Sequence, residues 1–187
     1  MRLKRLIFPA VASLLVIGVI LLSATAVLAY KYSGIHWDTH HIHYNHSTLP
    51  LEPVDWRTQV TKAANTWNRA PANFYNHWSF SDNTFTAADF GAVSIAYTWI
   101  SYAPGTLHLD DVDSSFNTYY PYSIGGGGGT YDIQTVALHE FGHWLSLGDL
   151  SGYLPWHWPR VMCGSYNGVK RSLHQDDING IVHIYGQ

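Results

Sequence analysis

The sequence is poor in cysteine and in charge. Cys163 is the single cysteine among 187 residues, so the chain forms no disulfide bond within itself. Only 12% of the residues are charged, the formal net charge is -3, and no long basic run occurs, so nothing in the composition favours a nucleic-acid partner. No phosphate-loop lysine follows the five glycines at 125–129, so a flexible connection is a plainer interpretation than a nucleotide cradle.

The first 29 residues have the pattern of a secretory signal peptide. Residues 1–5 are basic, residues 6–22 are almost wholly apolar, and small residues precede a cut expected after Ala29. The apolar run is nearly long enough to act instead as an uncleaved signal anchor. The small-residue site and Pro9 favour cleavage. We therefore expect a secreted, extracellular protein, and a membrane association only if the segment is retained.

The remainder, residues 30–187, has the length of one domain with a sizeable core. Apolar residues recur at helical spacing between 60 and 67, after a capping candidate, Asp55. They recur again between 178 and 185, after a capping box that we assign to Ser172 and Gln175. Both segments are predicted to be amphipathic helices.

Strand signals come from other stretches of the domain. Residues 41–44 are expected to form the first strand, and the period of two over residues 93–99 predicts a half-buried strand. The polar and aromatic stretch 74–86 is typical of a loop, and residues 106–109 are expected to form a short strand. The acidic residues 110–113 could bind Ca²⁺, but they lack the spacing of a known calcium loop, so a solvated turn is favoured.

Histidine is concentrated at the start of this domain. Five of the twelve histidines lie between residues 30 and 46, namely His36, His40, His41, His43 and His46. A second metal site there is one interpretation. Surface histidines that flank a strand are the favoured one.

The pattern HExxH occupies residues 139–143. On a helix, the spacing of four residues puts His139 and His143 on one face, where both imidazoles can bind one zinc ion. Glu140 then lies beside the metal, where it can accept a proton from an activated water. A chance match on a core helix is the alternative, but the flanking residues are apolar nearly all round, and a buried carboxylate without a partner is costly.

A catalytic zinc ion needs three protein ligands and an open fourth position. Glu52 and Glu140 are the only glutamates, so no glutamate follows His143 to complete the site. Asp149 lies ten residues after His139, just past the helix end expected at Gly148. The candidates for the third ligand are Asp149, His157, His174, Asp176, Asp177 and His183.

Three motifs together resemble the matrixins, a family within the metzincin zinc peptidases. YDIQTVALHEFGH at 131–143 is similar to the catalytic helix of that family, and Val161-Met162 is similar to its Met-turn. LHQDDINGI at 173–181, followed by Tyr-Gly at 185–186, is similar to its closing helix. The resemblance extends from about residue 37 onward and is strong after residue 131.

The sequence departs from the family pattern HExxHxxGxxH at two positions. Ser146 stands in place of the glycine and Asp149 in place of the third histidine. An aspartate ligand is similar to the snapalysins, a secreted bacterial metzincin group, and a carboxylate oxygen is an acceptable zinc donor. His157 remains the reserve ligand. We expect Ser146 to carry backbone strain or to pass the glycine's role to Gly148.

The resemblance implies an α+β, zincin-like fold with a mixed twisted sheet and three helices. It further implies a zinc-dependent endopeptidase with Glu140 as general base and Met162 as a hydrophobic floor. An extended peptide would pair with the edge strand near residues 107–110, with Leu107 and Leu109 as contacts and Tyr166 in the wall of the specificity pocket. Peptides or proteins are the expected substrates of a monomeric enzyme.

A different class of protein stays open. Aromatic residues make up 15% of the chain and include eight tryptophans, which also suits an exported binding module with a vestigial, non-catalytic metal site. Glu140 discriminates between the two hypotheses, because a vestigial site has no need of it.

Overall fold

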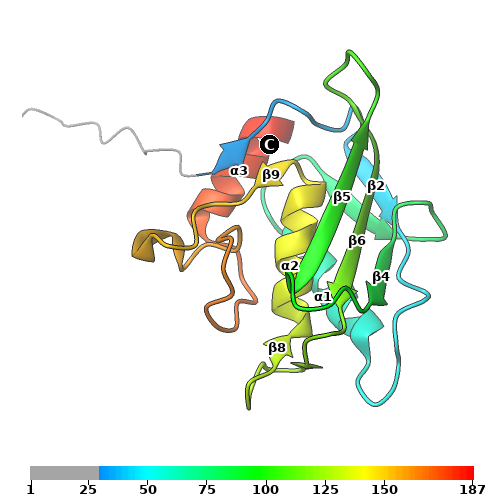
Figure 1. Ribbon diagram of the computed structural model, residues 1–187. Helices are drawn as coiled ribbons and strands as arrows, with labels where there is room; N and C mark the ends of the chain where they lie inside the picture. The colour runs from blue at the N-terminus through cyan, green and yellow to red at the C-terminus, as the bar shows by residue number, and fades with distance from the viewer. Residues whose placement is uncertain (1–29) are drawn as a thin grey trace, which may run out of the picture.

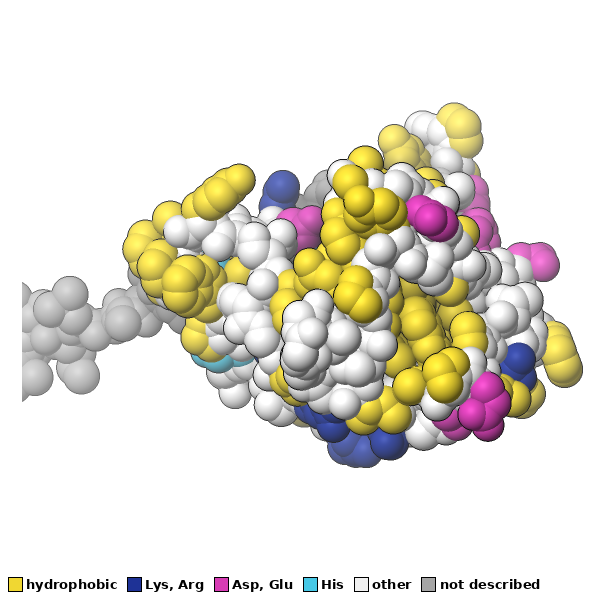
Figure 2. Space-filling model, turned by 60° about the horizontal axis from the view of Figure 1, so that its bottom comes forward, with side chains coloured by type: hydrophobic (Ala, Val, Ile, Leu, Met, Phe, Trp, Pro, Cys, Tyr) yellow, Lys and Arg dark blue, Asp and Glu magenta, His cyan; other side chains and the backbone are white. Residues whose placement is uncertain are grey.

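The computed structural model describes residues 30–187 (Figure 1). The predicted signal segment, residues 1–29, lies outside the described residues. Within residues 30–187, no helix combines the length and the apolar character that crossing a membrane requires. Hydrophobic side chains cover much of the face in Figure 2, and charged side chains are scattered over it.

The described chain mixes helices with short strands, which confirms the predicted α+β class. The helices are α1 (Trp56–Trp67), α2 (Ile133–Trp144) and α3 (Gln175–Tyr185), with a 3-10 turn η1 (Pro155–His157). The strands are β1 (Lys31–Tyr32), β2 (His41–Tyr44), β3 (Tyr75–Trp78), β4 (Phe85–Ala88), β5 (Ala96–Tyr102), β6 (Leu109–Asn117), β7 (Tyr122–Ser123), β8 (Tyr131–Asp132) and β9 (Leu147–Gly148).

The main β-structure is a mixed layer in which five strands lie in the order β3-β2-β4-β6-β5. Strands β2 and β3 pair in parallel, as do β4 and β6, whereas β5 runs antiparallel to β6. A parallel bridge between Asn45 and Thr84 joins the two parts, and the Phe85 amide donates to the Asn45 carbonyl at 2.8 Å. Strand β5 therefore forms one edge of the layer, and α2 packs against it (Figure 1).

Buried tryptophans fix α2 within the core. The Trp67 indole, from α1, donates to the Leu138 carbonyl at 2.8 Å. Trp37 donates to the Trp144 carbonyl at 2.7 Å, and Trp144 donates to the Ser114 hydroxyl of β6 at 2.7 Å. Each of these rings is at least nine-tenths buried, so packing and directional bonds together hold the helix.

Two of the loop and turn predictions are wrong. The segment 74–86 contains β3 and the start of β4. Its alternation is hard to see in sequence because only Asn76 of β3 is buried, while Tyr75 and Trp78 are half exposed. The acidic residues 110–113 lie within β6 instead of a turn. Strand β6 starts at Leu109, so the short strand expected at 106–109 is not formed.

The other elements agree with the sequence in part. Residues 41–44 form a strand, although β1 precedes it, and Asp55 caps α1 by accepting from the Thr58 amide at 2.9 Å. The capping box of α3 uses His174 and Asp177 instead of the predicted Ser172 and Gln175.

Candidate metal centre

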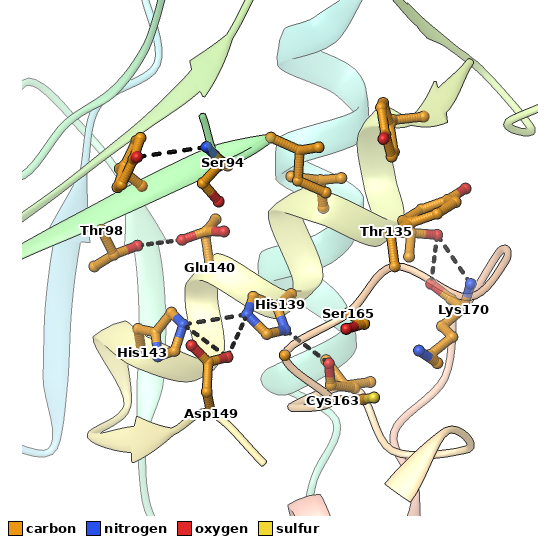
Figure 3. Close-up of a pocket in the computed structure, with 18 of the residues that line it drawn as sticks. Ser94, Thr98, Thr135, His139, Glu140, His143, Asp149, Cys163, Ser165 and Lys170 are labelled. Atoms are coloured by element: carbon orange, nitrogen blue, oxygen red, sulfur yellow. Dashed lines mark hydrogen bonds and ion pairs between the residues drawn. The ribbon is translucent and has the colours of Figure 1, made fainter. Parts of the chain in front are cut away.

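The two histidines of α2 point to the same place. His139 and His143 lie one turn apart, with their ring centroids 4.8 Å apart and their Nε2 atoms 3.2 Å apart (Figure 3). The helix that presents them begins at the N-cap Asp132, whose carboxylate accepts from the Thr135 amide at 3.0 Å. The predicted pairing of the two imidazoles is present in the structure.

Backbone carbonyls set the orientation of both rings. Nδ1 of His139 lies 2.8 Å from the Val161 carbonyl, and Nδ1 of His143 lies 2.8 Å from the Leu147 carbonyl. A carbonyl oxygen only accepts hydrogen bonds, so we assign the proton of each ring to Nδ1. The Nε2 lone pairs then face each other across the site, as metal-binding histidines require.

Asp149 reaches the same point from the segment after the helix. Its Oδ1 lies 3.0 Å from Nε2 of His139 and 3.7 Å from Nε2 of His143. The chain turns back through Ser146, which has a φ of 69° and is the only non-glycine residue with positive φ in residues 30–187. Ser146 therefore takes the left-handed conformation itself and does not pass it to Gly148.

The geometry of the three residues fits a zinc ion. Ligand atoms placed about 2.0 to 2.1 Å from a tetrahedral zinc ion lie about 3.3 Å apart, and the observed separations are 3.2, 3.0 and 3.7 Å. Two lone pairs and a carboxylate oxygen would repel one another unless a positive charge lies between them. Among the described residues, no other set of three histidine, cysteine or acidic side chains brings its donor atoms this close.

The pKa values of the three side chains also indicate that the cluster favours a positive charge. Burial opposes protonation of His139, but the hydrogen bond to Asp149 and the charge of Glu140 outweigh it and raise the pKa of His139 to about 9. Burial and the neighbouring His139 lower the pKa of His143. Burial alone would raise the pKa of Asp149, yet the contact with His139 holds it below its ordinary value. The cluster thus stabilises one cationic charge at the point where the three side chains meet.

Glu140 lies beside the cluster and not within it. Its side chain is buried, and its Oε2 accepts a hydrogen bond of 2.5 Å from the Thr98 hydroxyl of β5 (Figure 3). Thr98 also lies 2.6 Å from the Ser114 hydroxyl of β6. A hydrogen-bond chain from the sheet therefore fixes the orientation of the Glu140 carboxylate.

These groups line one open cleft of about 620 Å³. Strand β5 and the residues before it form one wall, α2 forms the floor, and the segment 161–170 forms the opposite wall. The family model for peptidase M10, matrixin, matches residues 36–186, which is most of the chain. The chain belongs to the matrixin family. Matrixins are zinc metalloproteases, so the family itself implies peptide or protein substrates and a metal at this cluster.

The edge strand of this matrixin differs from the prediction. Strand β6 lies between β4 and β5, so the segment near residues 107–110 is not the sheet edge, and β5 takes that place. Leu109 is buried and pairs with Tyr102, while Leu107 is exposed, and neither side chain lines the catalytic cleft. The sequence could not predict this difference, because β6 pairs with β4 on one side and β5 on the other, and no local pattern records the strand order.

Thr98 is a residue of the site in this matrixin that the sequence did not predict. The alternation over 93–99 suggests that the odd-numbered residues face inward. In the structure Ala96 is the buried residue of β5, and the adjacent even position, Thr98, contacts Glu140. Val93 and Trp99 are half exposed. The residue that contacts Glu140 therefore comes from the even-numbered positions of the strand, which the alternation predicts to face outward. No sequence motif identifies Thr98.

Met162 packs under α2, as the matrixin Met-turn implies. Its side chain is 1% exposed, and a Cβ at Gly142 would meet its Sδ at 2.1 Å, so only glycine allows this approach. The carboxylate of Asp177, from α3, accepts from the amides of Val161 and Met162 at 2.9 and 3.2 Å. The closing helix thereby holds the turn that also supplies the carbonyl partner of His139.

The remaining predicted residues of this matrixin lie at defined places. Tyr166 lines the cleft, and its hydroxyl accepts from the Asp132 amide at 3.2 Å. His157 ends η1 and its Nδ1 lies 3.0 Å from the Ser151 carbonyl, outside the ligand cluster. The structure therefore brings Asp149, and not His157, to the two histidines of the helix.

Proposed function

We propose that this matrixin is an exported zinc endopeptidase in which Glu140 is the general base. One observation carries the proposal: three metal-binding atoms meet beside a buried, oriented carboxylate in a cleft that is open to a peptide chain. His139, His143 and Asp149 would hold the zinc ion. When bound there, zinc supplies a Lewis acid that polarises the scissile carbonyl and acidifies the attacking water.

The protein side chains move the protons. The Thr98 hydroxyl donates a hydrogen bond to Oε2 of Glu140, so Oε1 is the oxygen that accepts the proton of the attacking water. Glu140 then passes this proton to the nitrogen of the leaving amine. The Nδ1 contacts of both histidines keep their Nε2 atoms directed at one point throughout.

The substrate would bind as an extra strand. Within residues 30–187, strand β5 pairs only with β6, so its other edge offers backbone donors and acceptors to an extended peptide. Residues 94–98 line the same cleft as Glu140, which supports a binding mode in which the peptide lies over this carboxylate. On the opposite wall Tyr166 packs against Tyr131, with ring centroids 5.0 Å apart, and both would contact a substrate side chain.

Export is part of the proposal and is supported by the sequence of residues 1–29. A basic start, an apolar run and small residues before Ala29 form the pattern of a signal peptide. The alternative binding module with a vestigial metal site is less well supported, because such a module would not need a buried carboxylate held at 2.5 Å from a hydroxyl.

The experiment compares the two glutamates of the chain. Glu140→Gln keeps the shape of the side chain but removes the base, so zinc content should stay near that of the wild type while casein cleavage falls by about 10² to 10⁴-fold. Glu52→Gln is the matched control, because Glu52 is exposed and lies outside the cleft. Full cleavage by the Glu140→Gln protein would refute the proposed role of Glu140.

A further inference from the structure

Three histidines share the outer face at the β3 edge of the sheet, away from the proposed catalytic residues. His41 and His43 are two residues apart on β2, and the register pairs His43 with His77 of the neighbouring β3. Alternate residues of a strand lie on one face, and directly paired residues of neighbouring strands share a face. Ile42 and Asn76 between them are buried, so the three imidazoles project together to the solvent.

The ring spacings are close to those of a three-histidine metal site. The ring centroids of His41 and His43 are 5.8 Å apart, those of His41 and His77 are 6.1 Å apart, and those of His43 and His77 are 5.7 Å apart. Three imidazoles on one tetrahedral zinc ion have ring centres about 5.2 Å apart, as follows from a Zn–N distance of about 2.0 to 2.1 Å. Each pair therefore needs to close by less than about 1 Å.

The three rings are free to make this adjustment. Their side chains are exposed, and within residues 30–187 none of their ring nitrogens has a hydrogen-bond partner. The nitrogens do not yet meet as those of the catalytic cluster do, so binding requires rotation of the side chains. His40, by contrast, has its Nδ1 committed to the Asn73 carbonyl at 2.9 Å.

We propose that His41, His43 and His77 form a second metal site, which binds a divalent transition metal. Imidazole nitrogens as the only protein donors suit Zn²⁺, Cu²⁺ or Ni²⁺ and do not suit Ca²⁺ or Mg²⁺, which prefer oxygen ligands. The site would link β2 to β3, which pair over only four residues at the edge of the sheet. It shares no residue with the catalytic cluster and does not depend on the proposed peptidase activity.

Zinc titration of the purified, metal-free chain tests the site. The wild type should bind two equivalents, and His43→Asn and His77→Asn should each weaken the second equivalent by roughly tenfold or more, since each removes one of three ligands. His40→Asn is the matched control, because it removes an exposed neighbouring histidine outside the trio. It should bind two equivalents as tightly as the wild type.

Two further variants keep the test decisive. In a His139→Ala, His143→Ala double variant the catalytic cluster is destroyed, and one equivalent of zinc should still bind, so the two sites fail independently. His41→Asn provides a third substitution within the trio should either of the others fold poorly by circular dichroism. A wild type that binds a single equivalent, or folded trio variants that keep both equivalents at full affinity, would overturn the proposal.

Discussion

Thr98 is the residue on which the orientation of Glu140 depends. Replacing it with valine keeps the β-branched shape and removes the 2.5 Å hydrogen bond to the carboxylate. A hydrogen bond to a charged group contributes about 1.5 to 3 kcal/mol, so kcat should fall by roughly 10 to 100-fold while zinc content and KM change little. Steady-state peptide cleavage measures this change.

Thr86→Val is the matched control for Thr98→Val. The Thr86 hydroxyl makes only a 3.4 Å contact with the Ser114 carbonyl, and its side chain lies outside the cleft. The kcat of the Thr86→Val protein should equal that of the wild type. Unchanged kcat in the Thr98→Val protein would mean that the hydroxyl does not position the base.

Ser146 combines backbone strain with a side-chain contact. Its φ of 69° costs a non-glycine residue about 1 kcal/mol, while its hydroxyl lies 3.2 Å from the Tyr185 hydroxyl. Ser146→Ala keeps the strain and loses the contact, whereas Ser146→Gly loses both. We therefore expect the glycine variant to be more stable than the alanine variant by about 1 kcal/mol in urea unfolding. Equal stability of the two variants would show that the turn is unstrained.

At the residue scale, the site residues that could be predicted from the sequence are those whose positions follow from local spacing. The interval of four residues places His139 and His143 together on any helix, and Glu140 follows from the same motif. Thr98 was not predictable, because its function arises from the packing of β5 over α2, about forty residues along the chain. Asp149 is intermediate: its nearness in sequence suggested it, and the turn at Ser146 brings it to the metal-binding atoms.

At the scale of elements, α2 depends on its buried N-cap. The Asp132 carboxylate accepts from the Gly125 and Thr135 amides and pairs with Arg171 at 2.8 Å. Burial by itself would raise the pKa of Asp132, but the bonds to Arg171 and Thr135 outweigh it and hold the pKa below its ordinary value. Because the folded-state pKa is depressed, Asp132 stabilises the protein above the unfolded-state value of about 3.9. That contribution is lost as the pH falls through the folded-state pKa.

The variant Asp132→Asn tests this pH dependence. The free energy of unfolding at pH 7 should fall by about 3 kcal/mol, because a cap is weakened and Arg171 loses its buried partner. The variant should also lose less stability than the wild type on acidification below about pH 4. Asp55→Asn, at the N-cap of the more exposed α1, is the control and should cost about 1 kcal/mol or less. Parallel acid profiles for the wild type and Asp132→Asn would contradict the account.

Elements with a strong internal period were predictable, and elements defined by their neighbours were not. Helix α1 and strand β2 could be located because their buried positions repeat at 3.6 or 2 residues. Strand β3 was mistaken for a loop because only Asn76 of its four residues is buried, while Tyr75 and Trp78 are half exposed. The edge position of β5 is a property of the strand order, which no local pattern records.

At the scale of the whole molecule, separate segments meet to build one site. Helix α2 supplies two histidines, the segment after it supplies Asp149, and the turn at Val161 orients His139. Asp177 of α3 fixes that turn through two backbone amides. The sequence predicted the Met-turn and the closing helix through its resemblance to the matrixins, and Asp149 through its nearness to the histidines. The links between these segments are tertiary contacts and emerge only in the structure.

The identity of the third zinc ligand is the central claim about the metal centre, and it can be tested directly. Asp149 meets the two histidines in the structure, whereas His157 lies outside the cluster. Zinc affinity at the catalytic cluster should therefore be compared among the parent protein, Asp149→Ala and His157→Ala, with His77→Asn as the common background to weaken binding by the surface histidines.

We predict that Asp149→Ala weakens zinc binding by about 100-fold or more, since it removes a direct ligand, and that His157→Ala binds zinc as tightly as the parent protein. The reverse result, with wild-type affinity in Asp149→Ala and a large loss in His157→Ala, would contradict the proposed metal centre.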